Sequence, residues 1–285
     1  MVDKTRFIRA LRPFSFVVAV SSCLLGVVLA YVDGAQNIYL GALLVVTGLI
    51  LQSAVNLIND YSDRENREYS TEQRERIIRN MKIGRALFLM VVVLGLYMVS
   101  IRGLPLLALG LVGILGAWGY TCGTINYKQR GLGVVLVFFL MGVMMIGGCY
   151  YTMSGNYQWS IFWLSIPFSL FTSLLLLANE LRDFEEDSKN GIATLTVRIG
   201  FNHSIKLYGV MLSLIYISSL LLYWQGMLST VLLLLIPLIA TPAPLRLLHR
   251  GPDSRKVLPQ LTGRLYFVYS AAFLVTLMIE PSLPI

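Results

Sequence analysis

Two clusters of acidic side chains stand at the ends of long apolar segments, and their residue types could hold a divalent cation. The first cluster runs from Asn56 to Asp63 and the second from Asn179 to Asp187. In each cluster an Asn is followed four residues later by an Asp, and a second Asp follows three or four residues further on. Residues three and four apart share one face of a helix, so each cluster is expected to direct an Asn and two carboxylates the same way.

Oxygen ligands of this kind suit Mg²⁺, which commonly binds through one or two carboxylates together with substrate phosphates. We therefore interpret the clusters as two half-sites that hold Mg²⁺ and, through it, a diphosphate. The expected metal ligands, which are also the expected catalytic residues, are Asp60, Asp63, Asp183 and Asp187. The expected substrate-binding residues beside them are neutral amides and cations that a diphosphate requires as donors: Asn56, Asn59, Asn179, Arg64, Lys128 and Lys189. The alternative is that both clusters are ordinary interfacial acids that end helices.

The composition is that of an integral membrane protein. Of the 285 residues, 56% are hydrophobic and only 13% are charged, and the mean hydropathy is +0.70. A soluble globular domain carries about 25% charged residues. The three cysteines are isolated, and the two histidines lack an HExxH context, so neither a disulfide framework nor zinc or iron chemistry is expected.

Nine apolar segments are close to the length that a transmembrane helix needs, about 17–25 residues. They predict an all-α, polytopic membrane protein with a single transmembrane domain over residues 1–285. The predicted spans are residues 14–31, 38–58, 86–101, 104–121, 132–153, 159–179, 207–224, 227–248 and 265–280.

The distribution of positive charge sets the expected orientation of these spans. Of the 23 Lys and Arg residues, 22 fall on the side of the predicted bundle that carries the N-terminus, and only Arg102 falls on the other. An excess of Lys and Arg marks cytoplasmic segments, so the N-terminus and both acidic clusters are expected in the cytoplasm. The net charge of +8 is then explained by topology, and nucleic acid is not expected as a partner.

The second cluster continues into a longer motif that resembles a family signature. The segment from Asn179 to Gly200, NELRDFEEDSKNGIATLTVRIG, is similar to the second Asp-rich signature of the UbiA-type aromatic prenyltransferases. The resemblance is closest to the branch that prenylates 1,4-dihydroxy-2-naphthoate in menaquinone biosynthesis. The first cluster resembles that branch's first signature, and the segments 120–123 and 130–133 are similar to a third. The pair Arg12-Pro13, before the first span, also suits the family.

This resemblance implies a nine-helix bundle around a central cavity that opens to the cytoplasm and to membrane lipid. It implies Mg²⁺-dependent transfer of a polyprenyl group from polyprenyl diphosphate to an aromatic acceptor, with Tyr120 among the substrate-binding residues. In the naphthoate branch the prenyl group replaces a carboxylate, so decarboxylation accompanies transfer. The location implied is the inner membrane of a bacterial or archaeal cell.

Other functions stay open on the sequence alone. Val134 stands where the naphthoate branch carries a Glu, so the acceptor could instead be 4-hydroxybenzoate, homogentisate, haem or a glycerol phosphate. A secondary transporter is a different class, but it predicts acids near the bilayer midplane and discontinuous helices on both sides. A CDP-alcohol phosphotransferase would need a DGxxAR run, which the chain lacks.

Overall fold

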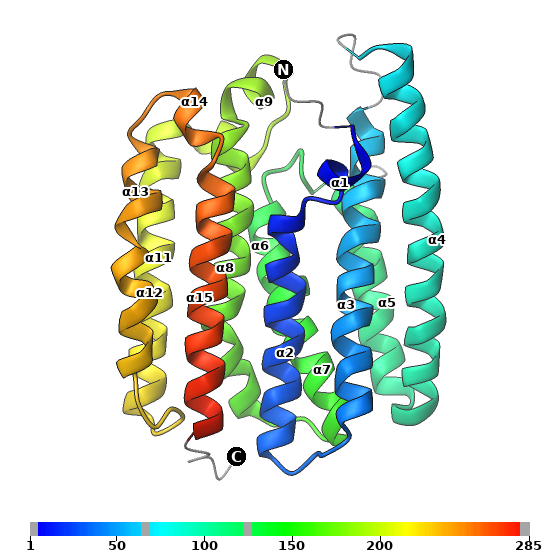
Figure 1. The fold of residues 1–285 in the computed structure, drawn as a ribbon, viewed down its shortest axis with the longest axis vertical. Helices are drawn as coiled ribbons and strands as arrows, with labels where there is room; N and C mark the ends of the chain where they lie inside the picture. The colour runs from blue at the N-terminus through cyan, green and yellow to red at the C-terminus, as the bar shows by residue number, and fades with distance from the viewer. Residues whose placement is uncertain (1–4, 64–68, 122–126, 280–285) are drawn as a thin grey trace.

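The computed structural model of the chain describes residues 5–63, 69–121 and 127–279, without the side chains at 62, 63, 118, 120 and 121. Every regular element in these ranges is helical, which confirms the predicted all-α class. Within these ranges, successive membrane-length segments of the chain run alternately up and down the bundle, and seven of them contain one long helix each (Figure 1). These helices are α2 (Phe16–Val32), α3 (Ile38–Asn59), α4 (Thr71–Arg102), α5 (Leu104–Thr121), α8 (Trp159–Arg182), α11 (Phe201–Trp224) and α15 (Leu258–Ile279).

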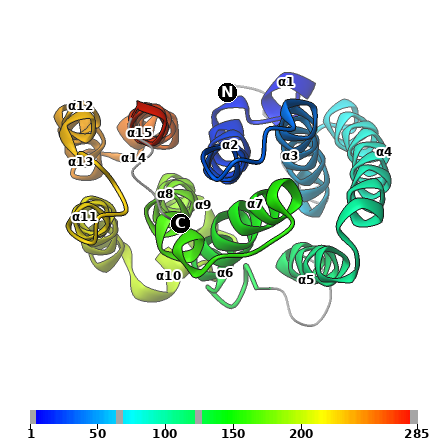
Figure 2. The same cartoon turned by 90° about the horizontal axis from the view of Figure 1, so that it is seen from below.

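Shorter elements complete the bundle. The segment Gly133–Ser154 is one helix made of α6 (Gly133–Val137), a π-helical part η3 (Phe138–Met144) and α7 (Met145–Ser154). The remaining elements are α1 (Phe7–Ala10), η1 (Pro13–Ser15), η2 (Asp60–Asp63), α9 (Phe184–Lys189), α10 (Leu195–Ile199), η4 (Leu232–Leu234), α12 (Leu235–Ala240), α13 (Pro242–Leu248) and α14 (Pro252–Arg255). Seen along the helices, α4 and α5 lie at one side of the molecule and α11, α12 and α13 at the other (Figure 2).

The predicted number of nine spans is not confirmed. Within the described residues, seven helices are long and apolar enough to cross a membrane. The predicted spans 104–121 and 227–248 correspond to shorter apolar helices, Leu104–Ala117 and Leu232–Leu248. The second of these is interrupted at Thr241, between α12 and α13. Pro242 follows directly and has no backbone N–H to continue the helical hydrogen bonds, which explains the interruption.

Helix α4 begins at Thr71, much earlier than the predicted span, which starts at residue 86. The sequence analysis assigns residues 71–85 to the loop before that span. A capping box starts the helix at Ser70, whose hydroxyl accepts from the Gln73 N–H while the Gln73 side chain accepts from the Ser70 N–H. The Arg, Lys and Glu residues that follow are good helix formers. Hydropathy detects only the apolar part of such a helix, so it missed the polar first half.

Helices α2 and α8 form the centre of the bundle. α2 packs against α3, α7, α8 and α15. α8 is the most buried of the candidate spans, and its Phe168 and Phe171 pack against Tyr266 and Tyr269 of α15. The two helices that carry the acidic clusters, α3 and α8, therefore both contact the same central helix, α2.

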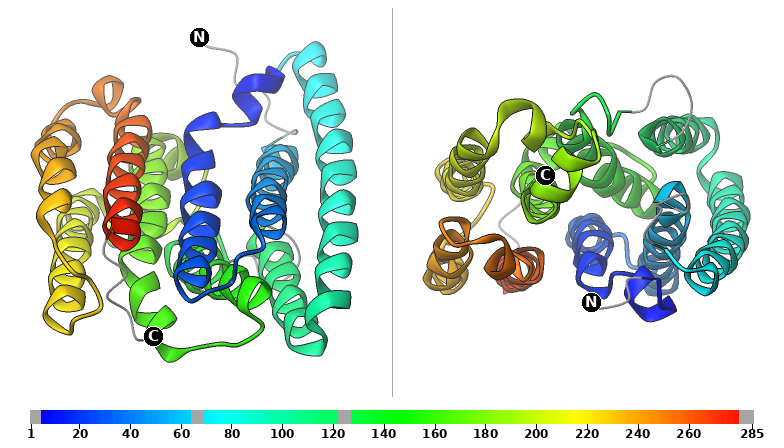
Figure 3. Two further views of the ribbon diagram at one scale, coloured as in Figure 1. Left: turned by 60° about the horizontal axis from the view of Figure 1, so that its bottom comes forward. Right: turned by 90° about the horizontal axis from the view of Figure 1, so that it is seen from above.

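Both acidic clusters lie at the same end of the bundle, as predicted from the topology. α3 and α8 end beside α1 and α9, at the upper end in Figure 1 and in the tilted view of Figure 3. Arg102, the only basic residue expected at the opposite end, ends α4 there. Its guanidinium donates to the carbonyl oxygens of Thr152 and Met153, at 2.6 and 2.5 Å, and so satisfies the last turn of α7.

Candidate active site

The first cluster lies where α3 changes into a 3-10 turn. The α-helix ends at Asn59, and Asp60 to Asp63 continue as η2. A 3-10 turn is tighter than an α-helix and spaces its side chains differently. The predicted common direction of Asn56, Asp60 and Asp63 stays a prediction. The side chain of Asp63 and the whole of Arg64 lie outside the described residues, so their predicted roles stay predictions.

An arginine from the N-terminal segment reaches the first cluster. The Arg12 guanidinium donates to Asp60 Oδ1 at 2.6 Å, with the two side chains 40% and 18% exposed. Arg12 has a φ of +50°, and every other non-glycine residue in the described ranges has a negative φ. Left-handed backbone costs free energy for a residue with a Cβ, and the following Pro13 restricts it further. The chain thus holds a strained backbone at the residue that contacts Asp60.

Asn56 lies one turn below Asp60 and is buried. Its amide nitrogen donates to the carbonyl oxygen of Leu11 at 2.8 Å and to the Ser15 hydroxyl at 2.9 Å, and its oxygen accepts from Gln52 at 3.2 Å. These bonds fasten the segment before α2 to α3, and so place Arg12 beside Asp60. The predicted contacts of Asn56 and Asn59 with substrate stay predictions.

The second cluster lies at a break between α8 and α9. α8 ends at Arg182, Asp183 joins the two helices, and Phe184 begins α9. The Arg182 guanidinium donates two hydrogen bonds to the Asp183 carboxylate, at 2.8 and 2.5 Å. Asp187 is only 8% exposed, and its N–H donates to the Asp183 carbonyl oxygen at 2.8 Å. Asn179 is half-buried and donates to the Leu175 carbonyl oxygen at 3.1 Å.

A buried carboxylate joins this cluster to the segments around it. Glu180 Oε2 accepts from the Thr196 N–H at the start of α10, at 3.1 Å. Asp187 and Lys128 both lie within electrostatic range of the Glu180 carboxyl group. Lys128 lies in a turn whose next residue, Gln129, contacts Ala193 beyond the second cluster, and Lys189 is exposed at the end of α9. The predicted roles of both lysines stay predictions.

The turn that carries Lys128 is held against the second signature by hydrogen bonds. Gln129 accepts from the Ala193 N–H at 3.1 Å, and Arg198 donates to the Gln129 carbonyl oxygen at 2.6 Å. Gly131 follows with a φ of +71° and lies against the Arg198 side chain, where a Cβ would clash. The segment 130–133, part of the third match to the family, thus packs directly on the second Asp-rich signature. The side chain of Tyr120 lies outside the described residues.

The arrangement has the donor chemistry that Mg²⁺ prefers, since each cluster supplies carboxylate oxygens at one end of the bundle. Among the described side chains, no three His, Cys, Asp or Glu residues gather closely enough to hold a metal by themselves. Pairs of carboxylates completed by phosphate oxygens would still fit the ion. Convergence of the two clusters on one cavity stays a prediction.

Sequence reasoning missed five residues of this region as site residues: Arg12, Glu180, Arg182, Arg198 and Arg255. Glu180 and Arg182 stand inside the second signature, so their position could have singled them out. Arg12 was noted only as part of the resemblance, and its contact with Asp60 joins residues 48 apart in the chain. Arg198 and Arg255 depend on tertiary packing that no local pattern reveals.

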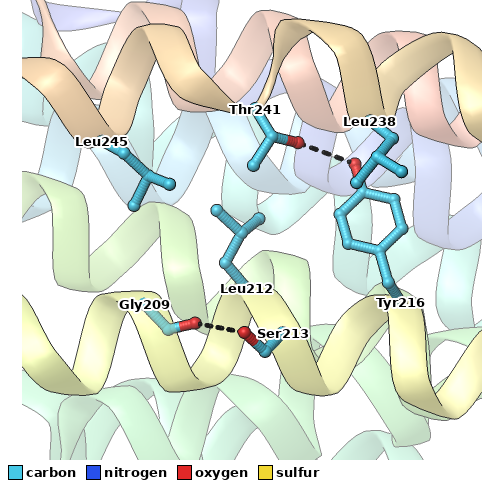
Figure 4. Close-up of a pocket in the computed structure, with 7 residues that line it drawn as sticks. All are labelled: Gly209, Leu212, Ser213, Tyr216, Leu238, Thr241 and Leu245. Carbon is cyan, nitrogen blue, oxygen red and sulfur yellow. Dashed lines mark hydrogen bonds between the residues drawn. The ribbon is translucent and has the colours of Figure 1, made fainter.

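A groove of about 300 Å³ lies away from the clusters, between α11 and α12–α13 (Figure 4). The Tyr216 and Thr241 hydroxyls lie 3.1 Å apart across it. Its lining residues are Gly209, Leu212, Ser213, Tyr216, Leu238, Thr241 and Leu245. None of the predicted site residues lines this groove, so it is not part of the candidate site.

Comparison with known sequences gives a consistent result. The model of the UbiA prenyltransferase family matches residues 19–278. The 1,4-dihydroxy-2-naphthoate octaprenyltransferase of Mycobacterium leprae is 31% identical over 252 residues, which cover 81% of this chain and 81% of that protein. The UbiA prenyltransferase domain-containing protein 1 of Gallus gallus is 30% identical over 289 residues, covering 97% of this chain and 85% of that protein.

Solved structures share the fold at much lower identity. A UbiA homolog from Archaeoglobus fulgidus, bound to GPP and Mg²⁺, superposes with a TM-score of 0.63 at 12% identity, over 94% of this chain and 99% of that one. A digeranylgeranylglyceryl phosphate synthase superposes with a TM-score of 0.61 at 17% identity, over 95% of this chain and 99% of the other.

Proposed function

The chain belongs to the UbiA prenyltransferase family, and on that premise we propose that it prenylates 1,4-dihydroxy-2-naphthoate in menaquinone biosynthesis. It is a prenyltransferase and an integral membrane protein. The proposed donor is a polyprenyl diphosphate, and the whole of residues 1–285 is proposed to form one transmembrane domain.

The observation that carries the donor half of this proposal is the pair of acidic clusters at one end of the bundle. In each, the first Asp lies against an arginine, Arg12 beside Asp60 and Arg182 beside Asp183. Carboxylates and guanidinium groups together suit a magnesium diphosphate, which needs oxygen ligands for the metal and cationic donors for the phosphates. The Mg²⁺ and GPP bound by the fold relative from Archaeoglobus fulgidus agree with this donor chemistry.

The acceptor half rests on sequence. Relatives named 1,4-dihydroxy-2-naphthoate octaprenyltransferase match at 31% identity in both Mycobacterium leprae and Haemophilus influenzae. The third match, which carries Arg130 to Gly133, packs on the second signature through Gln129 and Arg198. Tyr120, from the other part of the third match, is the proposed acceptor contact.

The chain's own residues have separate proposed tasks. Asp60, Asp63, Asp183 and Asp187 would hold Mg²⁺, which when bound stabilises the charge that develops on departing diphosphate. The cations proposed to neutralise the phosphates are Arg64, Lys128 and Lys189. The amides proposed to orient the phosphates are Asn56, Asn59 and Asn179. The surrounding apolar helices would exclude water from the allylic carbon until the acceptor attacks.

The proposed reaction breaks the C–O bond between the prenyl C1 and the diphosphate. The new C–C bond forms at the ring carbon that carries the carboxylate. The carboxylate then leaves as CO₂, and the electron pair of its bond to the ring restores aromaticity. The products are therefore prenylated naphthalenediol, diphosphate and CO₂ in equal amounts.

We propose that the end of the bundle with both clusters faces the cytoplasm of a bacterial or archaeal cell. The bias of 22 among 23 Lys and Arg residues toward that side of the predicted topology supports this orientation. The orientation would let a water-soluble acceptor enter from the cytoplasm while the prenyl donor arrives through membrane lipid.

The test is an assay of purified protein in nanodiscs with Mg²⁺ and octaprenyl diphosphate. 1,4-Dihydroxy-2-naphthoate is compared with 4-hydroxybenzoate, homogentisate and haem, and both prenylated product and CO₂ are measured. The proposal predicts equal yields of product and CO₂ with the naphthoate. Transfer to another acceptor alone, or transfer to the naphthoate without CO₂, would overturn the acceptor assignment.

A further inference from the structure

A buried arginine contacts the segment that carries the second acidic cluster. Arg255 ends α14, the short helix before α15, and only 2% of it is exposed. It comes from a part of the chain with no resemblance to an Asp-rich signature. A buried guanidinium is costly unless its charge and its N–H groups find partners, so its partners indicate what it does.

Arg255 contacts the chain on both sides of Asp183. One terminal nitrogen donates to the Leu181 carbonyl oxygen at 2.9 Å, in the last turn of α8. The other terminal nitrogen forms a short ion pair with the Glu185 carboxylate, in the first turn of α9. Arg255 therefore caps the end of one helix and holds the start of the next, with Asp183 between them.

Aromatic packing closes the same joint from the side. The guanidinium carbon of Arg255 lies 4.3 Å from the ring centroid of Phe201, and the Phe201 ring packs at 5.3 Å against Phe184, the residue after Asp183. A planar guanidinium can stack on a ring and donate in two directions at once, which a lysine ammonium cannot do. The joint between α8 and α9 is thus held by contacts to Leu181, Phe184 and Glu185.

These contacts also determine which acids of the cluster are used for support. Glu185 pairs with Arg255, and Glu180 accepts from the Thr196 N–H. These two bonds fix the acids on either side of Asp183 to other parts of the chain. The proposed metal ligands Asp183 and Asp187 lie between and beside them, on a backbone whose direction those two bonds set.

We propose that Arg255 is a positioning residue, which orders the joint between α8 and α9 so that Asp183 and Asp187 hold Mg²⁺ and diphosphate. The inference rests on the proposed donor chemistry and is independent of the acceptor. Loss of groups that orient metal ligands typically lowers metal affinity about 10–100-fold. The half-saturating Mg²⁺ concentration is therefore expected to rise at least about tenfold when Arg255 is replaced.

The experiment compares wild type with Arg255→Gln, Arg255→Lys and Glu185→Ala in nanodiscs. Arg250→Gln is the matched control, because Arg250 is an exposed arginine in the same connection between α13 and α15. Two quantities are measured for each variant. The first is hydrogen–deuterium exchange of the amides at 183–191, without substrate. The second is how strongly a non-reactive polyprenyl thiolodiphosphate binds at different Mg²⁺ concentrations, with the rise in melting temperature as the measure of binding.

The expected result for Arg255→Gln is faster exchange at 183–191, unchanged exchange in α3, and the shifted Mg²⁺ dependence. Arg255→Lys and Glu185→Ala should show smaller shifts in the same direction, and Arg250→Gln none. Wild-type exchange and Mg²⁺ dependence in Arg255→Gln would overturn the proposal. If Arg255→Gln fails to fold, wild-type behaviour of both Arg255→Lys and Glu185→Ala would overturn it. Failure of wild type itself to bind the thiolodiphosphate with Mg²⁺ would instead refute the proposed donor chemistry.

Discussion

Gly142 in η3 is expected to tolerate no larger residue, because η3 and α8 approach there at backbone distance. A Cβ built on Gly142 would lie 2.4 Å from the Cβ and 2.6 Å from the Cα of Ser169, whereas ordinary contacts of this kind begin at 3.4 Å. Gly142→Ala would therefore force the two helices apart by about 1.0 Å, the difference between 3.4 Å and the shorter of these distances. Overpacking of this kind typically costs about 1–3 kcal/mol.

The matched control is Gly95→Ala in α4, where the same Cβ would meet nothing within 4 Å. Both substitutions gain helix propensity, up to about 1 kcal/mol, so the difference in unfolding free energy between the variants isolates the overpacking. Unfolding in SDS, monitored by circular dichroism, should give Gly142→Ala an unfolding free energy about 1–3 kcal/mol lower than that of Gly95→Ala. Because α8 carries the second cluster, transfer activity of folded Gly142→Ala should fall too. Equal stability of the two variants would refute the close approach.

Three further outcomes are expected. Asp60→Ala and Asp183→Ala each abolish prenyl transfer in folded protein, since each removes a carboxylate from the proposed Mg²⁺ site. The control Asp253→Ala removes an exposed acid at the same end and retains transfer activity. Prenyl transfer by Asp60→Ala or Asp183→Ala would contradict the role of that residue. Arg102→Leu deprives two carbonyl oxygens of their donor and should lower the unfolding free energy by about 1–3 kcal/mol in SDS titration; unchanged stability would show that those bonds contribute nothing. Chelation with EDTA stops transfer and added Mg²⁺ restores it, and activity that persists in EDTA would rule out the metal.

Much of the helical framework could be predicted, because apolar length is a strong signal in a membrane protein. The spans 38–58 and 159–179 match α3 and α8 within three residues, since each apolar run ends abruptly at a polar cluster. The early start of α4 was missed because its first half is charged. The capping box at Ser70 and Gln73 is the local signal that could have found it.

The sequence indicated which residue types form the candidate site, but not the tertiary contacts that hold those residues in place. Spacing and resemblance singled out the four aspartates, and Lys128 was expected only as one of the loop cations that a diphosphate needs. Contacts such as Arg12 with Asp60, or Arg255 with Glu185, join residues 48 and 70 apart. Such pairs depend on how helices pack, which hydrophobic periodicity does not specify. The break of each cluster across a helix end also changes the geometry that a continuous helix would give.

The two acidic clusters are proposed to act together on one diphosphate. The most direct measurement is a structure of the protein with Mg²⁺ and a polyprenyl thiolodiphosphate, in which distances from the metal to the carboxylate oxygens are read. We expect Mg²⁺ on one diphosphate, with carboxylate oxygens of Asp60 and of Asp183 each about 2.0–2.1 Å from a metal ion. A diphosphate held by one cluster alone, with the other cluster's carboxylates apart from any metal, would contradict it.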